Sequence, residues 1–204
     1  MSLPDIIREA IKCGPVPNLR PIEEIQADIE EREELRHLLR YEGDDIDLSP
    51  VHERLDEITV TRGEEVIFFA YHHLVVPEGM KMGQPLLLDP FQRAFILAVL
   101  DNPHTTHFAY LSVAARNGKT MMLAVLLICF LIGPLAVRNS NVASGAMSRE
   151  QAGLCFELMH KILIASPDCA GAWEAVASSK KIVGINLNTT YRALSADAKT
   201  GYGM

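Results

Sequence analysis

The apolar positions in the first 80 residues recur every third or fourth residue, the spacing of a helix with one buried face. The clearest stripe follows Pro21, a residue suited to the first helical position, and continues to Leu39. Ser49-Pro50 predicts the start of a shorter helix, with the serine as its cap. We therefore expect this region to be helical, with helices over 4–13, 21–39, 49–58 and 64–76.

After residue 80 the pattern changes to alternating helical and strand-like segments. Helices are expected over 90–100, 120–132 and 148–165, and strands over 108–113, 141–146, 181–187 and 190–194. The last two strands lie close enough in sequence to form a hairpin. The order strand, helix, strand, helix, strand predicts a three-layer α/β fold with a mainly parallel sheet, preceded by the helical region as an N-terminal appendage.

Charge divides the chain at the same place. Residues 1–80 hold 19 acidic and 8 basic side chains, whereas residues 81–204 hold 7 acidic and 11 basic ones. An acidic first part excludes binding of nucleic acid through bulk charge there. Its glutamate-rich helix face is expected to be solvated, rather than to bind a partner. We expect an acidic helical region over 1–80 and a second domain over 81–204, with the boundary in the Pro- and Gly-rich connector 77–85.

Neither cysteines nor hydrophobic runs point to secretion or a membrane. The four cysteines lack metal-ligand spacing, and buried reduced thiols are the expected state, which fits a cytoplasmic protein. The longest apolar run, over 121–132, has 12 residues and is too short to cross a bilayer, so a buried core helix is expected. No secretory signal opens the chain.

A candidate phosphate-binding loop stands between a strand-like segment and this apolar helix. It comprises six consecutive residues: Ala115, Arg116, Asn117, Gly118, Lys119 and Thr120. The loop amides and the helix N-terminus would offer N–H donors to phosphate oxygens, Lys119 would reach the outer phosphates, and the Thr120 hydroxyl would ligate Mg²⁺. The consensus is incomplete, because Val113 occupies the position of the first glycine. The pattern predicts a nucleotide-binding fold of the P-loop NTPase type, and the alternative is a basic turn before a core helix.

Four segments, taken in order, resemble the large terminase subunits of tailed phages. They are Gly83 to Gln92, the Arg-containing phosphate loop, Val142 to Ala146 followed by Gln151-Ala152, and Ala193 to Asp197 followed by Gly201. The resemblance covers residues 68–204. It implies the ATPase part of a motor that packages double-stranded DNA into capsids in the host cytoplasm. The implied partners are that DNA, the terminase small subunit, the capsid portal and further copies of the chain.

The resemblance also implies roles for individual residues. Gln92 would contact the adenine of ATP, and Phe91 would pack against the base. Arg116 would stabilise the terminal phosphate, so that Arg116 and Lys119 form the catalytic pair and Mg²⁺ is the metal cofactor. A guanidinium suits this task because it is a planar donor of two hydrogen bonds.

Two departures from the family pattern accompany the match. Only Asn117 separates Arg116 from Gly118, where the family commonly has two residues. The apolar strand ending in Asp-Glu, which holds Mg²⁺ and positions water, has no counterpart in these 204 residues, and Asp197 is the nearest acid. We expect the chain to be part of a larger ATPase and inactive alone. The alternatives are another nucleic-acid motor of helicase type, or a non-catalytic interaction module.

Overall fold

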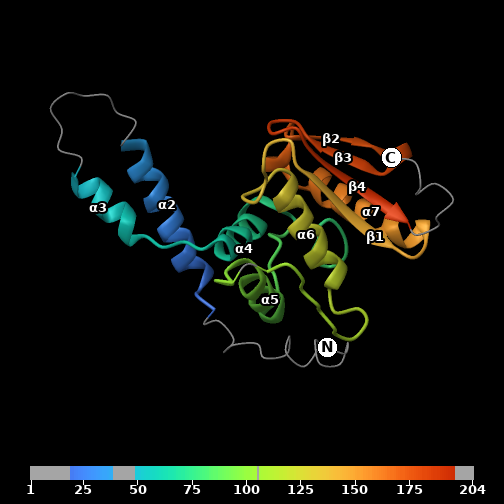
Figure 1. Ribbon diagram of the computed structural model, residues 1–204, viewed down its shortest axis with the longest axis horizontal. Coiled ribbons are helices and arrows are strands. Elements are labelled where there is room, and N and C mark those ends of the chain that lie inside the picture. The colour runs from blue at the N-terminus through green and yellow to red at the C-terminus, as the bar shows by residue number, and fades with distance from the viewer. Residues whose placement is uncertain (1–18, 39–48, 105, 196–204) are drawn as a thin grey trace. The chain divides into compact units, whose positions relative to one another are not determined.

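The structure, a computed structural model, describes residues 19–38, 49–104 and 106–195, and these form two compact units (Figure 1). Unit 1 contains the described residues up to Glu64 together with Asp89–Tyr110, and unit 2 contains Glu65–Leu88 and the described residues from Leu111 onward. The boundary expected between residues 80 and 81 therefore lies inside the first segment of unit 2. The helix expected over 4–13, Asp197 and Gly201 lie outside the described residues.

Unit 1 is helical, as the spacing of apolar residues predicts. Its helices are α2 (Ile22–Leu38), α3 (Ser49–Glu57), the first turn of α4 (Arg62–His73) and α5 (Pro90–Leu100). The apolar stripe of α2 buries Ile22, Ile25 and Ile29, while its glutamates stay at the surface. Arg54 of α3 donates two hydrogen bonds to the Glu31 carboxylate, at 2.7 and 2.9 Å, and so joins α3 to α2.

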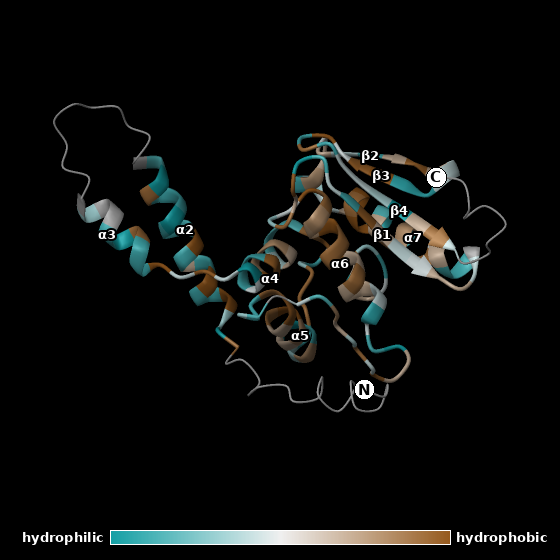
Figure 2. Cartoon of the chain, viewed as in Figure 1, coloured by the Kyte–Doolittle hydropathy of each residue, from teal (hydrophilic) through white to brown (hydrophobic). Residues whose placement is uncertain are grey.

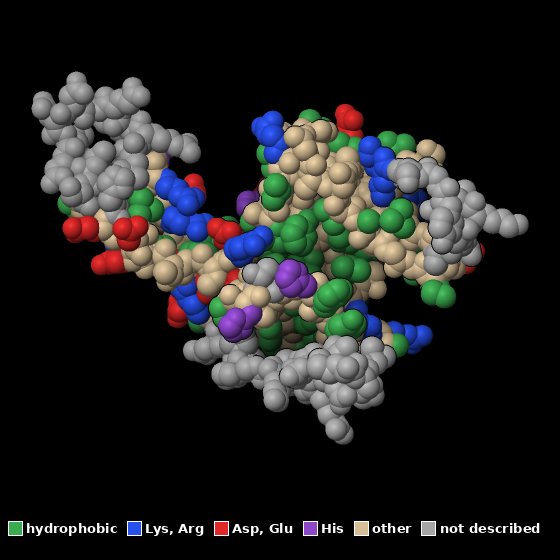
Figure 3. Space-filling view, viewed as in Figure 1, with side chains coloured by type: hydrophobic (Ala, Val, Ile, Leu, Met, Phe, Trp, Pro, Cys, Tyr) green, Lys and Arg blue, Asp and Glu red, His purple; other side chains and the backbone are tan. Residues whose placement is uncertain are grey.

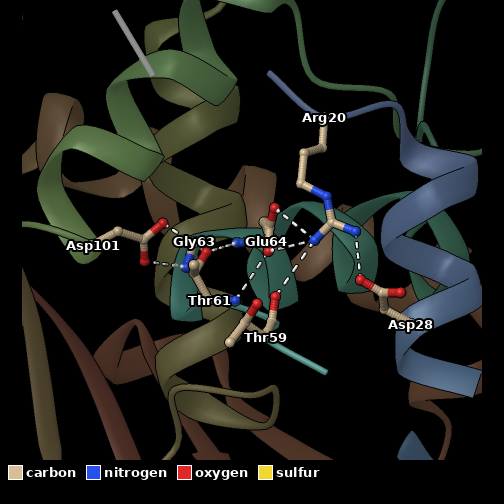
Figure 4. Close-up of polar contacts among 7 residues, drawn as sticks. All are labelled: Arg20, Asp28, Thr59, Thr61, Gly63, Glu64 and Asp101. Carbon is tan, nitrogen blue, oxygen red and sulfur yellow. Dashed lines mark hydrogen bonds and ion pairs between the residues drawn. The ribbon is translucent and has the colours of Figure 1, made fainter. Parts of the chain in front are cut away.

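The N-terminus of α4 is capped by two carboxylates (Figure 4). Thr61 and Glu64 form a capping box: the Glu64 N–H donates to the Thr61 hydroxyl at 3.2 Å, and the Thr61 N–H donates to the Glu64 carboxylate at 3.0 Å. Asp101, at the end of α5, accepts from the Thr61 hydroxyl at 2.7 Å and from the Gly63 N–H at 2.9 Å. The pattern Thr-x-x-Glu explains why α4 begins at Arg62, two residues before the expected start.

Arg20 connects the segment before α2 to this cap. Its guanidinium donates to both Glu64 oxygens, at 3.3 and 3.4 Å, and also pairs with Asp28 (Figure 4). The Glu64 side chain is buried, so its charge requires these partners. One arginine thus joins α2 to the start of α4, which is distant from it in sequence.

In unit 2, α4 ends at His73, three residues before the end expected from its apolar pattern. The reason lies in the next residues. Val75 forms an antiparallel bridge with Pro85, and the Val76 N–H donates to the Gln84 carbonyl at 2.9 Å. The connector 77–85 is therefore a closed loop whose backbone pairing competes with the helix.

The rest of unit 2 is a four-stranded sheet with helices packed against it. Its main elements are α6 (Lys119–Leu131), β1 (Asn141–Ala146), α7 (Arg149–Ala165), β2 (Trp173–Val176), β3 (Lys181–Gly184) and β4 (Thr189–Ser195). The strand order is β1-β4-β3-β2, with β1 and β4 parallel and the other two pairings antiparallel. The expected hairpin of the last two strands is confirmed as β3 and β4.

The expected mainly parallel sheet fits only in part, because the sheet in the described part of the chain is mixed. Strands β2, β3 and β4 follow one another through short turns, and such connections give antiparallel neighbours, whereas the long path through α7 allows β1 and β4 to run parallel. Sequence analysis missed β2, a short strand with little apolar alternation.

The described helices cover one face of this sheet. Ile182 and Tyr191 point to the covered face and are fully buried, whereas Arg192 and Leu194 point to the other face and are exposed. Helices α6 and α7 contact each other and also the strands β1 and β4. The described residues thus form two layers instead of the expected three.

Residues 108–113, expected to form the strand before the phosphate loop, pair with none of the described strands. The segment is extended, but Phe108 is 82% exposed and Tyr110 is 78% exposed. An apolar run becomes a strand only where a neighbouring strand supplies hydrogen bonds, and none of the described strands lies beside it.

Helix α6 is a core helix, as expected. Figure 2 shows it as mostly hydrophobic along its length, and seven of its residues between Met122 and Leu131 are buried. No helix in the described part of the chain has the length and apolar character needed to cross a membrane. Three of the cysteines are free and buried, and burial raises the pKa of Cys169 to about 11.

Strands β1 and β4 are joined by a buried pair of hydroxyl groups. The Ser144 and Tyr191 oxygens lie 2.7 Å apart across the parallel pair, and the Tyr191 side chain is completely buried. Burial is the largest cause that raises the pKa of Tyr191, to about 12. The hydroxyl pair therefore satisfies polar atoms that would otherwise be buried without a partner.

Candidate nucleotide-binding loop

The loop predicted to bind phosphate is a tight turn that leads directly into α6. Residues 115–118 form the turn, Gly118 is the N-cap, and Lys119 is the first helical residue. The first N–H groups of a helix have no partner within the helix, and those of α6 begin at this turn. The helix dipole adds partial positive charge at the same place, which favours an anion.

The backbone of the loop alternates in handedness. Arg116 has φ of 66° and Gly118 has φ of 69°, both in the left-handed region, while Asn117 between them does not. Successive amides in such an alternation point into one concavity, an arrangement that binds anions in many proteins. Arg116 adopts this conformation without being glycine or asparagine, which is unusual for a residue with a long side chain.

Lys119 folds back over the beginning of the loop. Its ammonium donates to the Val113 carbonyl at 2.7 Å and to the Ala114 carbonyl at 2.6 Å. The charge is thus held within the loop by two backbone dipoles. A phosphate group would have to compete with these carbonyls for the same ammonium.

The other loop side chains face solvent. Ala115, Arg116, Asn117 and Thr120 are all exposed. Among the described residues, no group of three His, Cys, Asp or Glu side chains is arranged to hold a metal. Within this part of the chain, an Mg²⁺ ion at the loop would therefore depend on the Thr120 hydroxyl and on the phosphates of the nucleotide.

The residues predicted to contact adenine belong to unit 1, whereas the loop belongs to unit 2. Phe91 is 37% exposed on the first turn of α5. Gln92 is 4% exposed, and its side-chain carbonyl accepts a hydrogen bond from the Asp89 N–H at 2.8 Å. The role of both residues at the base remains a prediction.

Gln92 has a structural role that sequence analysis missed. It is the third residue of α5 and completes a capping box with Asp89. The signal was present in the sequence, because Asp-Pro-Phe-Gln has an acid at the cap and a glutamine three residues later. The contacts of Lys119 with the carbonyls of Val113 and Ala114 could not be predicted in this way, because they involve backbone groups and do not depend on residue type.

Comparison with known proteins supports the resemblance drawn from the motifs. No family model matches the chain. The large subunit of the terminase from Enterobacteria phage HK97 is 48% identical over 145 residues, which is 71% of this chain and 29% of that protein. The crystal structure of the HK97 large terminase matches with a TM-score of 0.65 and 46% identity, again over 71% of this chain and 29% of that one. The chain thus spans under a third of the relative's length.

Mixed α/β architecture, the loop before α6 and these two matches agree with one another. Over 71% of its length, the chain is similar to the large subunit of a phage terminase, and the resemblance first seen in four short motifs is confirmed.

Proposed function

We propose that this chain carries the ATP-binding loop of a viral DNA-packaging motor. The observation that supports the proposal is the loop at the start of α6, where a left-handed Gly118, the N-terminal turn of the helix and the Lys119 ammonium lie together. The match to a terminase large subunit makes DNA packaging a better assignment than another nucleic-acid motor or a non-catalytic module.

In this proposal the loop binds the triphosphate and Mg²⁺ as MgATP. The amides of residues 115–118 and the α6 N-terminus bind phosphate oxygens, and Lys119 exchanges its two carbonyls for the outer phosphates. Arg116, exposed at the turn, stabilises charge on the terminal phosphate, and Thr120 is the protein's ligand to the metal. Phe91 and Gln92 contact the base.

The whole motor would use ATP hydrolysis to translocate double-stranded DNA. Bound Mg²⁺ would supply charge neutralisation at the transferred phosphate. The proposed partners in the assembly are the terminase small subunit, the capsid portal and further copies of the chain.

Nucleotide titration of the 204-residue chain tests the loop. Replacing Lys119 by alanine removes a charged donor, so ATP affinity should fall by about tenfold to a hundredfold, as for the loss of a charge-assisted hydrogen bond. Lys81→Ala, which removes an exposed lysine from the loop 77–85, is the matched control and should bind ATP as the parent does. Equal affinity in the Lys119→Ala variant and the parent would refute the assignment.

A further inference from the structure

The face of the sheet in unit 2 that none of the described helices covers carries two cations at its centre. Lys181 of β3 and Arg192 of β4 are directly opposed in the antiparallel register, and both point away from α6 and α7. The Cβ atoms of opposed residues in such a pair are about 5 Å apart, and like charges at this spacing repel each other. Figure 3 shows blue side chains over the sheet of unit 2.

Neither cation has an acidic partner in the described part of the chain. Arg192 is exposed and Lys181 is partly exposed, and neither forms an ion pair with a described residue. Glu174 shares this face as a diagonal neighbour of Lys181, opposite Val183 and two residues along the strand, but forms no ion pair with either cation. An external anion would relieve the repulsion between Lys181 and Arg192.

The rest of the face favours a polyanion over an apolar helix. Its two most exposed large apolar side chains, Val176 at 46% and Leu194 at 54%, are not neighbours. Val176 is opposite Lys181 on the edge strand β2, and Leu194 pairs with Gly145 at the far end of β4. A helix laid across the face would have to bury both cations in order to contact both apolar groups, at a large desolvation cost.

On the β1 side, small residues leave the cations open to an approaching backbone. Ala143 is the parallel-strand partner of Arg192, and both Ala143 and Gly145 are exposed. Directly beside Arg192 that strand carries only a methyl group, and the next position toward Leu194 is a glycine, whereas Asn141 lies on the other side, in register with Thr190. A guanidinium in this position can offer two parallel N–H donors to one phosphate, and the lysine can reach the next.

We propose that this face contacts the phosphate backbone of double-stranded DNA through Lys181 and Arg192. The inference rests on the proposed function, since it names the surface by which the motor would hold its DNA. It is independent of the phosphate loop, which belongs to α6. The contact is with the backbone only, so it carries no preference for DNA sequence.

The test is equilibrium binding of the 204-residue chain to a duplex of random sequence, measured by fluorescence anisotropy over a range of salt concentrations. The double variant Lys181→Glu, Arg192→Glu should bind at least about tenfold more weakly at low salt. Two lost phosphate contacts should lower the slope of log affinity against log salt by about 1.8. The control, Lys81→Glu with Arg138→Glu, makes the same charge change at an exposed lysine and an exposed arginine outside the strands of unit 2, and should retain both affinity and slope.

Thermal unfolding of both variants establishes that they fold alike, and the milder pair Lys181→Gln, Arg192→Gln should show the same loss of slope. Equal DNA binding by the sheet variant and the control would overturn the proposal. An absence of DNA binding by the parent would also overturn it. So would a double variant that loses binding to polyglutamate but keeps its binding to DNA. ATP titration of the same proteins separates the two proposals. If ATP binding depends on Lys119 but DNA binding does not depend on Lys181 and Arg192, only the DNA surface is refuted.

Discussion

At the scale of single residues, the cap that Gln92 provides can be separated from the adenine contact that we propose for it. Its carbonyl oxygen caps α5 by accepting from the Asp89 N–H, and the proposal assigns its amide to adenine. Gln92→Glu keeps an acceptor for the cap and removes the amide donor, and because the side chain is only 4% exposed, the new carboxylate should also lower the free energy of unfolding. It should weaken ATP binding relative to inorganic triphosphate by the equivalent of one hydrogen bond, about 0.5–1.5 kcal/mol.

Calorimetric titration of both ligands measures the difference, and Gln92→Ala is the comparison that loses both the cap and the donor. If Gln92→Glu binds ATP and triphosphate with unchanged relative affinity, the residue serves α5 alone and does not contact the base.

Tyr191 offers a second prediction at this scale. Because burial raises its pKa to about 12, above the ordinary value of about 10, the folded state holds the phenol proton more tightly than the unfolded state does. Stability due to this group is complete below pH 10 and is lost as the pH rises toward 12. Tyr191→Phe should cost about 1 kcal/mol at neutral pH, because Ser144 loses its partner, and should reduce the loss of stability at high pH.

Chemical denaturation at neutral and alkaline pH measures both effects. Ser144→Ala combined with Tyr191→Phe should recover part of the neutral-pH loss, since no buried hydroxyl then lacks a partner. An alkaline transition identical in the parent and Tyr191→Phe would contradict this account.

At the scale of elements, two glycines in strands make a matched pair. A Cβ on Gly184 of β3 would come within 2.5 Å of the Leu131 carbonyl and would also collide with Thr189, whereas one on Gly145 of β1 meets nothing within 4 Å. Gly184→Ala should therefore lower the free energy of unfolding by about 2 kcal/mol or more, through overpacking between β3 and the end of α6.

Gly145→Ala, with the same chemical change, should be neutral or slightly stabilising, because alanine restricts the unfolded chain. Urea denaturation of both variants provides the comparison. Similar stabilities for the two would show that the contact between β3 and the end of α6 is looser than the structure describes.

Helices were easier to predict from sequence than strands, for reasons visible in particular elements. The spacing of Ile22, Ile25 and Ile29 is enough to identify α2, because a helix forms its hydrogen bonds within itself. Residues 108–113 have the composition of a strand, but pairing depends on a neighbour that local sequence does not name. Likewise, short turns make β2, β3 and β4 antiparallel and so determine the topology of the sheet. The strand β2 is too short for its sequence to predict it.

At the scale of the whole molecule, the prediction separates binding from turnover. The 204-residue chain contains the loop amides, Lys119 and Thr120, but its sequence has no apolar strand ending in Asp-Glu. We expect it to bind ATP and to release phosphate no faster than the Lys119→Ala variant, because hydrolysis needs carboxylates that hold Mg²⁺ and orient water.

Steady-state phosphate release with Mg²⁺ decides the matter, with EDTA and Lys119→Ala as controls. Turnover that is abolished by Lys119→Ala would mean that acids outside the expected pattern, such as Asp197, serve in catalysis.

The candidate site was predictable as far as side chains define it. Gly118, Lys119 and Thr120 lie at the start of a core helix, as their sequence context suggested. The left-handed backbone of Arg116 and the carbonyl partners of Lys119 could not be anticipated, since they depend on the path of the main chain and not on residue type.

The two carbonyls that hold Lys119 also keep its nitrogen from chemical reagents. An acylating reagent must reach this nitrogen, and Lys119 would first have to give up hydrogen bonds of 2.7 and 2.6 Å. In the nucleotide-free chain, Lys119 should therefore react with such reagents more slowly than the exposed Lys81, so that lysine labelling distinguishes the closed loop from one that has opened.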